Sequence, residues 1–447
     1  MTDDGAARAG ASRLTGRRGA ARARIVAGLA TLAIASVAAA SSCTSASGAE
    51  DVTIRFWAMG REGEVVRELV PEFERRNPGL HVRVQQMPWT AAHEKLLTGF
   101  VGDATPDVSQ LGNTWVPEFQ ALDALEPLNA YVQSSQAIDS TDYFRGIWDT
   151  NVLADTLFGL PWYVDTRLIY YRKDILARAG VTAPPRSWAE WKDAMHRVVA
   201  GKHAKYGILL PTNEWNQIVA LGIQQGSPIL RDGDQYGAFS EPKFSAAVDF
   251  YTSIFRENLA PTVSSSQIAN LFQEFGKGTF AMFISGPWQI GELNTRLPDS
   301  LKGKWAAAPL PSPDGANYPG LSLAGGSSLV IFRSSQRKAA AWKLIEFLSE
   351  PAQQARFAQL TGDLPARESA WRLAKLDTTQ ATIAFLEQLR HVAPTPKVPE
   401  WELIATRIFE STERVVRGVM TRAQAMKALD ADVNRILEKR RWMLAHR

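Results

Sequence analysis

Residues 52–57, which read VTIRFW, begin an alternation of strands and helices that decides the fold class. This segment alternates apolar and polar side chains well enough for a strand, and residues 64–76 carry apolar side chains at the spacing of an amphipathic helix. Asn77-Pro78-Gly79 ends that helix. A strand at 80–85, a helix at 93–100 and a strand at 107–111 follow. The order β-α-β-α-β predicts a mostly parallel sheet with helices on its faces.

Two loops of this unit are the first candidates for a ligand site. In open sheets of this kind, ligands bind at the carboxyl ends of the strands. The loops at residues 58–63 and 112–117 lie at such ends.

The same alternation starts a second time further along the chain. Strands are predicted at 168–171, 206–210 and 280–284, and helices at 175–180, 188–199, 243–257 and 266–275. Ser187 precedes one of these helices as its N-cap. Residues 309–319, rich in Pro, Gly and Asp, are predicted to cross between two lobes. A strand at 329–332, a helix at 336–349 and a helical C-terminal region complete the predicted α/β architecture.

The N-terminal 42 residues have the organisation of an export leader. Six arginines precede an apolar, small-residue run at 25–40, and Cys43, the single cysteine of the 447 residues, follows it. A cysteine at this place indicates acylation, with 43–50 as a linker. Ala38-Ala39-Ala40 also fits ordinary secretory cleavage, and Ala40 stands where lipoprotein leaders usually carry Leu. Both cleavage positions therefore remain open.

Charge and hydropathy exclude two classes of partner. The chain has 50 basic and 46 acidic side chains, but without residues 1–42 the numbers are 44 and 44, so no nucleic-acid partner is expected. After Cys43 no apolar stretch reaches the roughly 18–20 residues that a bilayer requires. We therefore expect membrane attachment only through Cys43.

Motifs for catalysis, metal binding and phosphate binding are missing. The chain has no G-x-S-x-G, its six histidines are scattered, and His93-Glu94 lacks a second histidine four residues on. Gly276-Lys277-Gly278-Thr279 lacks the first glycine of a P-loop. We therefore predict no catalytic residue, no metal and no cofactor. A pair of carboxylates, as in glycosidases, cannot be read from sequence, so an exported carbohydrate-active enzyme remains the alternative.

Tryptophan beside polar or small residues is the feature that points to a ligand. Such tryptophans lie in or near predicted loops at positions 57, 89, 115, 162, 215, 288 and 401. A pyranose has an apolar face that rests on an indole and a rim of hydroxyls that bind carboxylates, amides and guanidinium groups. The pattern is typical of a sugar-binding cleft. Trp188, Trp191 and Trp342, on predicted helices, are assigned to packing.

Seven motifs occur in one order through nearly the whole chain after the leader. They are Ile54-Arg55-Phe56-Trp57 with Phe73-Glu74-x-x-Asn77-Pro78; Gly102-Asp103-x-x-Pro106-Asp107-Val108; Leu160-Pro161 with Tyr170-Tyr171-Arg172-Lys173-Asp174; Pro184-Pro185-x-Ser187-Trp188-x-Glu190; Gly278-x-x-Ala281-Met282-x-x-x-Gly286-Pro287-Trp288; Gly325-Gly326-Ser327; and Gly362-Asp363-Leu364-Pro365-Ala366-Arg367. Together they resemble the extracellular solute-binding proteins of ABC importers, in the cluster that includes maltose-binding protein.

The resemblance implies a periplasmic-binding-protein type II-like fold, in which a hinge joins two α/β lobes around a ligand cleft. The lobes would comprise 51–163 plus 322–375, and 164–321 plus 376–447. It also implies a monomeric receptor in the periplasm or on the outer face of the cytoplasmic membrane. Such a receptor captures a carbohydrate without chemical change and delivers it to ABC permease subunits.

The resemblance also implies ligand-binding positions. Trp115, Trp215 and Trp288 would stack on the sugar, with hydroxyl partners at Arg61, Glu62, Asn113, Asp165 and Glu214. Further positions are Thr114, Trp162, Tyr163, Arg167, Asn213 and Trp401, with backbone donors at Gly325, Gly326 and Ser327. The expected ligand is an α-linked disaccharide such as maltose or trehalose. A phosphorylated polyol, an oligopeptide or an anion is the other ligand class, and its mark would be a dense Arg/Lys cluster.

Overall fold

The computed structural model describes residues 51–268 and 270–446. The predicted signal peptide, the linker and Cys43 lie outside the described residues. Within the described part of the chain, no helix is both long and apolar enough to cross a membrane.

The first lobe is built on a six-stranded sheet in the order β15-β6-β14-β3-β1-β2. Its strands are β1 (Val52–Met59), β2 (Leu80–Met87), β3 (Val108–Gly112), β6 (Leu160–Asp165), β14 (Gly325–Ile331) and β15 (Leu364–Pro365). β1 runs parallel to β2 and β3, as the sequence predicts, whereas β14 is antiparallel to both β3 and β6. The sheet therefore mixes a local parallel unit with strands that return from later in the chain.

The helix predicted at 64–76 is broken in the structure. It consists of α1 (Gly60–Val65), a 3-10 turn at Val66–Glu68, and α2 (Val70–Arg76). Pro71 stands in the first turn of α2, and because it has no amide proton it suits the start of a helix and not its interior. β1 ends at Met59 and α1 begins at Gly60, whose φ is +50°. The loop predicted at 58–63 is therefore a tight turn that places the first turn of α1 at the strand end.

The second lobe is built on a four-stranded sheet in the order β12-β7-β11-β8. Its strands are β7 (Leu168–Arg172), β8 (Tyr206–Leu209), β11 (Phe280–Ser285) and β12 (Trp305–Ala308). β11 is parallel to β8 and antiparallel to β7. The predicted strands at 168–171, 206–210 and 280–284 are confirmed within a residue or two. β12 has no counterpart in the prediction, because its sequence, WAAA, does not alternate.

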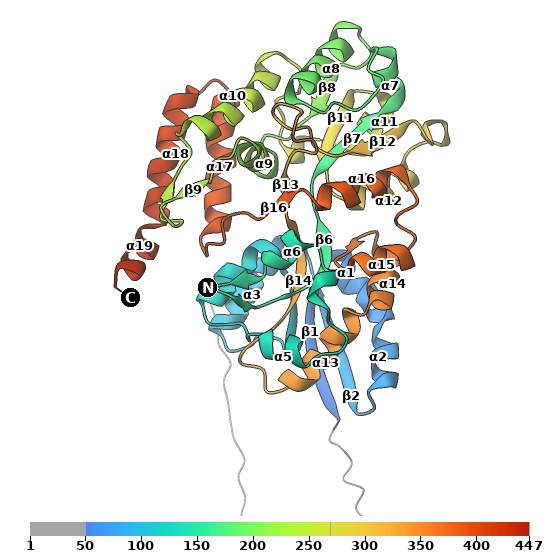
Figure 1. The fold of residues 1–447 in the computed structure, drawn as a ribbon, viewed down its shortest axis with the longest axis vertical. Helices are drawn as coiled ribbons and strands as arrows, with labels where there is room; N and C mark the ends of the chain where they lie inside the picture. The colour runs from blue at the N-terminus through green and yellow to red at the C-terminus, as the bar shows by residue number, and fades with distance from the viewer. Residues whose placement is uncertain (1–50, 269, 447) are drawn as a thin grey trace, which may run out of the picture. The chain divides into compact units, whose positions relative to one another are not determined.

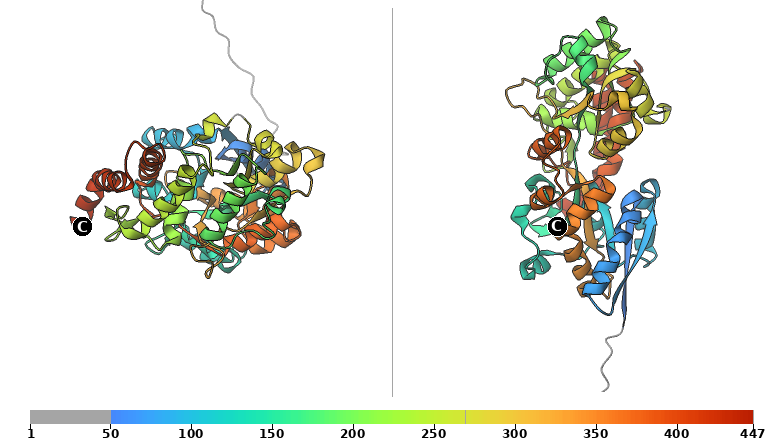
Figure 2. Two further views of the ribbon diagram at one scale, coloured as in Figure 1. Left: turned by 90° about the horizontal axis from the view of Figure 1, so that it is seen from above. Right: turned by 90° about the vertical axis from the view of Figure 1, so that its right-hand side faces the viewer.

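Three segments connect the two sheets. β6 ends at Asp165 and β7 begins at Leu168, so only Thr166 and Arg167 lie between the sheets at the first crossing. The second runs from β12 to β14, and its strand β13 (Ser322–Leu323) pairs in parallel with β16 (Val392–Ala393) of the third. Figure 1 shows the two lobes with β6, β13 and β16 at the waist between them, and the right view of Figure 2 shows the same division from the side.

Helices cover both sheets. Those between the strands of the first sheet are α3 (Trp89–Val101), α4 (Val116–Ala121), α5 (Asn129–Ser134) and α6 (Arg145–Asp149). The second lobe has α7 (Lys173–Arg178), α8 (Trp188–Ala200), α9 (Asn216–Gln224), α10 (Pro242–Arg256), α11 (Leu271–Lys277) and α12 (Trp288–Arg296). In place of the helix predicted at 266–275, a 3-10 turn at Ser265–Gln267 precedes α11, which Asn270 caps.

The C-terminal helices return to both lobes. α13 (Lys338–Leu348), α14 (Pro351–Thr361) and α15 (Glu368–Leu373) follow β14, and α14 packs against α1. α16 (Gln380–Leu389) packs on β12. α17 (Trp401–Val416) and α18 (Arg422–Ile436) pack with α10 in the core of the second lobe, and α19 (Glu438–Ala445) ends the chain. Two-residue strands form the hairpins β4 (Val152–Leu153) with β5 (Thr156–Leu157) and β9 (Leu230–Arg231) with β10 (Tyr236–Gly237).

The predicted N-cap at Ser187 is confirmed. Its hydroxyl oxygen accepts a hydrogen bond of 3.1 Å from the amide of Glu190 in the first turn of α8. α8 buries Trp188 and Trp191 in the core of the second lobe, which confirms that these tryptophans serve in packing.

Replacing Ser187 with Ala should lower the free energy of unfolding by about 1 kcal/mol, because the amide of Glu190 loses its acceptor. Ser300→Ala is the control, since Ser300 is exposed and its hydroxyl makes no hydrogen bond to any described residue. Urea denaturation of both variants measures the effect. Equal stability of the two variants would contradict a capping role for Ser187.

Candidate binding cleft

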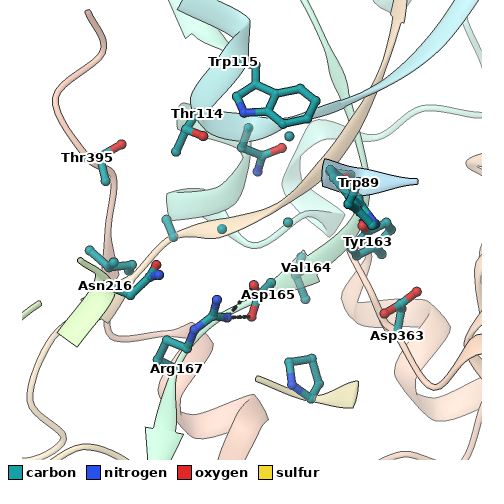
Figure 3. Close-up of a pocket in the computed structure, with 18 of the residues that line it drawn as sticks. Trp89, Thr114, Trp115, Tyr163, Val164, Asp165, Arg167, Asn216, Asp363 and Thr395 are labelled. Atoms are coloured by element: carbon teal, nitrogen blue, oxygen red, sulfur yellow. Dashed lines mark hydrogen bonds and ion pairs between the residues drawn. The ribbon is translucent and has the colours of Figure 1, made fainter. Parts of the chain in front are cut away.

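A cleft of about 540 Å³ opens between the lobes. Strand ends of the first sheet, the crossing segments, and loops and helix starts of the second lobe all contribute to its wall. Figure 3 shows Thr114 and Trp115 at the top of the view, Asn216 at the left, and Asp165 beside Arg167 below Thr114 and Trp115. The lining residues are Glu62, Trp89, Gly112, Asn113, Thr114, Trp115, Tyr163, Val164, Asp165, Arg167, Trp215, Asn216, Pro287, Trp288, Leu323, Ala324, Gly325, Gly326, Ser327, Asp363, Thr395 and Glu402.

Tyr163 is the centre of a hydrogen-bond network in the first-lobe wall. Its phenol donates to Oε1 of Glu62 at 3.0 Å and accepts from Oγ of Ser327 at 3.0 Å and from Nε2 of Gln110 at 3.1 Å. Oε1 of Gln110 in turn accepts from the amide of Met59 at 2.7 Å. The network joins β1, β3, β6 and β14 to α1, so it fixes Glu62 at the edge of the cleft.

Two carboxyl groups of this wall have little access to water. Glu62 and Asp363 are each 9% exposed. Burial raises the pKa of Glu62, and the hydrogen bond from Tyr163 opposes that shift. Burial and the neighbouring charge of Glu62 raise the pKa of Asp363 to about 8. The side chains of Asp363, Tyr163 and Trp89 lie on one side of the cleft (Figure 3).

An ion pair lies at the first crossing between the sheets. Nη1 of Arg167 binds both carboxylate oxygens of Asp165 at 2.6 Å, and the guanidinium lies 4.8 Å from the ring centre of Trp288. Burial raises the pKa of Asp165, and the Arg167 charge opposes this. The arrangement requires glycine at position 286, because a Cβ there would lie 2.7 Å from Oδ1 of Asp165 and closer still to the Trp288 ring. Trp288 keeps 38% of its surface exposed.

A direct contact joins the lobes across the cleft. Oγ1 of Thr114, in the 3-10 turn that follows β3, donates to Oε1 of Glu402 in α17 at 2.5 Å, and α17 belongs to the core of the second lobe. Burial raises the pKa of Glu402, while the hydrogen bond from Thr114 opposes the shift. Next to it, Trp89 and Trp115 pack edge to face with ring centres 5.6 Å apart, which gives the cleft an apolar corner.

The described residues include no group of three or more His, Cys, Asp or Glu side chains arranged to hold a metal ion. What the cleft offers is indole surface, carboxyl groups, one guanidinium, and amide and hydroxyl groups.

Comparison with known proteins identifies the family. Residues 59–355 match the model of the bacterial extracellular solute-binding proteins, which is well over half of the chain. The chain belongs to this family. The family's description places its members outside the cytoplasm, and it is a family of binding proteins. The predicted family resemblance and the predicted two-lobed α/β fold with a cleft between hinged lobes are confirmed.

Several relatives of this solute-binding protein carry more specific names. The structure of the sugar-binding protein MalE from Xanthomonas citri is 50% identical, covers 89% of this chain and 100% of its own, and superimposes with a TM-score of 0.85. The diacetylchitobiose-binding protein DasA of Streptomyces coelicolor is 24% identical over 88% of this chain and 91% of its own. The maltotriose-binding protein of Pyrococcus abyssi is 23% identical over 76% of this chain and 71% of its own.

Twelve of the seventeen binding positions predicted for this solute-binding protein line the cleft. They come from both lobes and from the crossings. They are Glu62, Asn113, Thr114, Trp115, Tyr163, Asp165, Arg167, Trp215, Trp288, Gly325, Gly326 and Ser327.

Two predicted tryptophans do not reach the cleft, so their assignment as binding residues is corrected. Trp162 is 1% exposed and stacks on Phe357 with ring centres 4.3 Å apart. It precedes Tyr163 on β6. Because successive strand residues point to opposite faces of the sheet, only one of the two side chains can face the cleft. Trp401 is 1% exposed at the start of α17 and packs edge to face on Trp215 at 5.4 Å, so it supports the cleft wall from behind.

Three predicted polar residues also lie outside the cleft lining. The guanidinium of Arg61 donates to the carbonyl of Leu360 at 3.1 Å. The amide group of Asn213 pairs with Ser265, donating to its hydroxyl at 2.9 Å and accepting from its backbone at 2.7 Å. Glu214 precedes the lining residue Trp215 and is not itself part of the wall.

Several lining residues were not among the predicted positions. The main ones are Trp89, Asn216, Asp363, Thr395 and Glu402. Trp89 belongs to the tryptophans noted near loops, and Asp363 to the motif Gly362-Asp363-Leu364-Pro365, so a signal existed for both. Glu402 adjoins Trp401 in the sequence. Which way its side chain points depends on where α17 begins and how the helix is rotated, and the sequence at the start of a helix does not determine this.

Proposed function

We propose that the protein is the extracytoplasmic carbohydrate receptor of an ABC importer. It captures an α-linked disaccharide such as maltose or trehalose, without chemical change, and delivers it to the membrane permease. The observation that carries the proposal is a cleft between two lobes that combines half-exposed indole with carboxyl, amide and hydroxyl groups.

The aromatic residues support a sugar ligand. Trp115, Trp215 and Trp288 come from three different segments of the wall and offer the flat apolar surface on which a pyranose face can rest. Glu62, Asn113 and Asp165 supply hydrogen-bonding groups beside them. The volume of about 540 Å³ lies within the range of roughly 300–1,000 Å³ usual for small-molecule sites, and a disaccharide fits such a space.

The charge of the lining argues against an anionic solute. Arg167 is the one basic side chain among the described lining residues, and Asp165 binds its Nη1 through both oxygens. An anionic or phosphorylated ligand would instead meet the carboxyl groups of Glu62, Asp363 and Glu402. A neutral polyhydroxylated ligand fits this wall better.

The names of the relatives support the carbohydrate class. The 50% identical protein of Xanthomonas citri is named a sugar-binding protein, and more distant relatives are named for diacetylchitobiose, maltotriose and arabinooligosaccharides. These ligands differ in monosaccharide and in length, so the α-linked disaccharide is the finer part of the proposal. The proposal also includes permease subunits as partners, a monomeric state and a lipid anchor at Cys43.

Replacing Trp288 with Ala should weaken binding by about 2–4 kcal/mol, because it removes a central aromatic anchor. The fold should persist, since the side chain is 38% exposed. Calorimetric titrations with maltose and with trehalose measure the loss. Trp442→Ala is the control, because Trp442 lies in α19 and is 62% exposed outside the cleft.

Unchanged affinity of the Trp288 variant would remove this residue from the site. Failure of the unmodified protein to bind either sugar would contradict the disaccharide proposal.

Replacing Cys43 with Ser should move the protein from the membrane fraction to the soluble extracytoplasmic fraction, because it removes the acylated side chain. Fractionation of the producing cells measures this, with Ser47→Ala as a control that leaves the cysteine intact. If the unmodified protein is already soluble, it is not anchored.

A further inference from the structure

The cleft holds an excess of acidic groups for which its own cations do not compensate. Glu62, Asp165, Asp363 and Glu402 line it, against Arg167 alone. Arg167 is already bound through Nη1 to both oxygens of Asp165 at 2.6 Å. Glu402 has a donor in Thr114. The remaining two acids, Glu62 and Asp363, form what we call the acid pair.

The backbone holds the acid pair in one corner of the first-lobe wall. Asp363 lies between Gly362, which ends α14 at a φ of +85°, and β15. β15 pairs antiparallel with β6, and Leu364 lies opposite Val164. If the same register is continued by one residue, Asp363 lies opposite Asp165. α1, which carries Glu62, packs on α14. The packing of these elements therefore holds the backbones of both acids in the same corner of the wall.

The charged and titratable groups around Asp363 leave its carboxyl poorly compensated. α1 contributes Glu62 and Arg61, β6 contributes Tyr163 and Asp165, and α14 contributes the hydroxyl of Thr361. Arg61 is the cation among them, but its guanidinium donates to the carbonyl of Leu360. No ion pair to Asp363 is found in the described part of the chain. Glu62, by contrast, accepts a hydrogen bond from the phenol of Tyr163.

We propose that the acid pair holds one proton at neutral pH, carried mainly by Asp363, and that this protonated carboxyl donates a hydrogen bond to an oxygen of the bound sugar. The second half of the proposal rests on the proposed function. Two ionised carboxylates at 9% exposure, with no ion pair to either among the described residues, would repel each other and lack hydration, so retaining one proton is the favourable state. The raised pKa of Asp363, about 8, agrees with this assignment.

The proton changes what the wall can recognise. An ionised carboxylate only accepts hydrogen bonds, whereas a protonated one both donates and accepts. A sugar presents ring and glycosidic oxygens that accept, beside hydroxyls that do both. A neutral Asp363 therefore supplies a donor in a wall where Glu62 and Asp165 provide acceptors. The same wall disfavours acidic sugars, because a carboxylate or phosphate would approach the charges of Glu62 and Asp165.

The proton also sets how stability depends on pH. In the unfolded chain an Asp loses its proton near pH 4, but in the folded protein Asp363 keeps it up to about pH 8. The unfolded state therefore binds fewer protons between these values. The contribution of Asp363 makes the free energy of unfolding fall as pH rises from about 4 to about 8, and it is constant above that range.

The first experiment needs no ligand and compares melting temperatures of the unmodified protein and Asp363→Asn from pH 5 to pH 9. Asn resembles the protonated acid and does not titrate, so the melting temperature of the variant relative to the unmodified protein should rise with pH and level off near pH 8. Asp299→Asn is the control, since the Asp299 side chain is 89% exposed. Parallel curves for the unmodified protein and Asp363→Asn would overturn the retained proton.

A second variant keeps the proposal testable if Asp363→Asn does not fold. Glu62→Gln removes the neighbouring charge, so the pH at which Asp363 titrates should fall. Carboxyl-carbon NMR with labelled aspartate should show one aspartate signal with a midpoint near pH 8 that moves lower in Glu62→Gln. The absence of any aspartate midpoint above pH 6 in the unmodified protein would contradict the proposal.

A third experiment separates the proton from its use in binding. Calorimetry with maltose and trehalose from pH 6 to pH 10 should show an affinity that is steady up to about pH 8 and falls above it, by at most about tenfold for each pH unit. pH-independent sugar binding, with the stability profile as expected, would overturn the hydrogen bond to the sugar. A retained proton without any sugar binding would count against the proposed function and not against the proton.

Discussion

The antiparallel pairing of β6 with β14 is the constraint on which the rest of the cleft depends. β6 runs through the first sheet, and its continuation becomes β7 of the second sheet after only two residues. Its partner β14 carries a bulge between Ser327 and Ser328 and a glycine, Gly326, with a φ of +125°. A Cβ at Gly326 would lie 2.3 Å from the carbonyl of Tyr163, so the close approach of the strands requires glycine there. The pairing therefore brings three features close together: the first crossing between the lobes, the ion pair of Asp165 with Arg167, and the wall that carries the acid pair.

This placement joins the mechanical and the chemical parts of the site. Asp165 and Arg167 lie at the first crossing, so two of the groups that line the cleft are also groups at which the lobes are connected. The contact of Thr114 with Glu402 ties the opposite walls at a second point. A ligand that bridges the walls would therefore bear directly on the arrangement of the lobes, which is how hinge-closing receptors couple binding to shape.

Much of the fold and part of the site could be predicted from the sequence, because both depend on local patterns. Alternating apolar residues predicted the strands and helices of the α/β lobes, and the family resemblance carried by the motif order implied most of the cleft positions. Local pattern could not tell which of two adjacent residues faces inward. Trp162 and Tyr163 look equally suitable, but only the tertiary position of β6 decides that Tyr163 faces the cleft.

The acid pair shows a second limit of sequence reasoning. Asp363 stands in a recognised motif, yet its properties come from burial and from Glu62, 301 positions away in the chain. The assignment of Trp401 to the cleft was wrong for a similar reason, because a tryptophan near a predicted loop can equally be the first residue of a buried helix. The apolar spacing continues across Pro71, so the spacing predicts one helix over 64–76 where the structure begins a new one.

The central claim is that the cleft between the lobes is a carbohydrate site. A thermal-shift screen of the purified protein against a library of neutral mono-, di- and oligosaccharides, with phosphorylated and acidic sugars included, tests it most directly. A sugar present at 100 times its Kd stabilises the folded state by about 2.7 kcal/mol. We predict that α-linked neutral disaccharides raise the melting temperature and that acidic sugars do not. A library in which no carbohydrate raises it, or in which only anionic solutes do, would contradict the account.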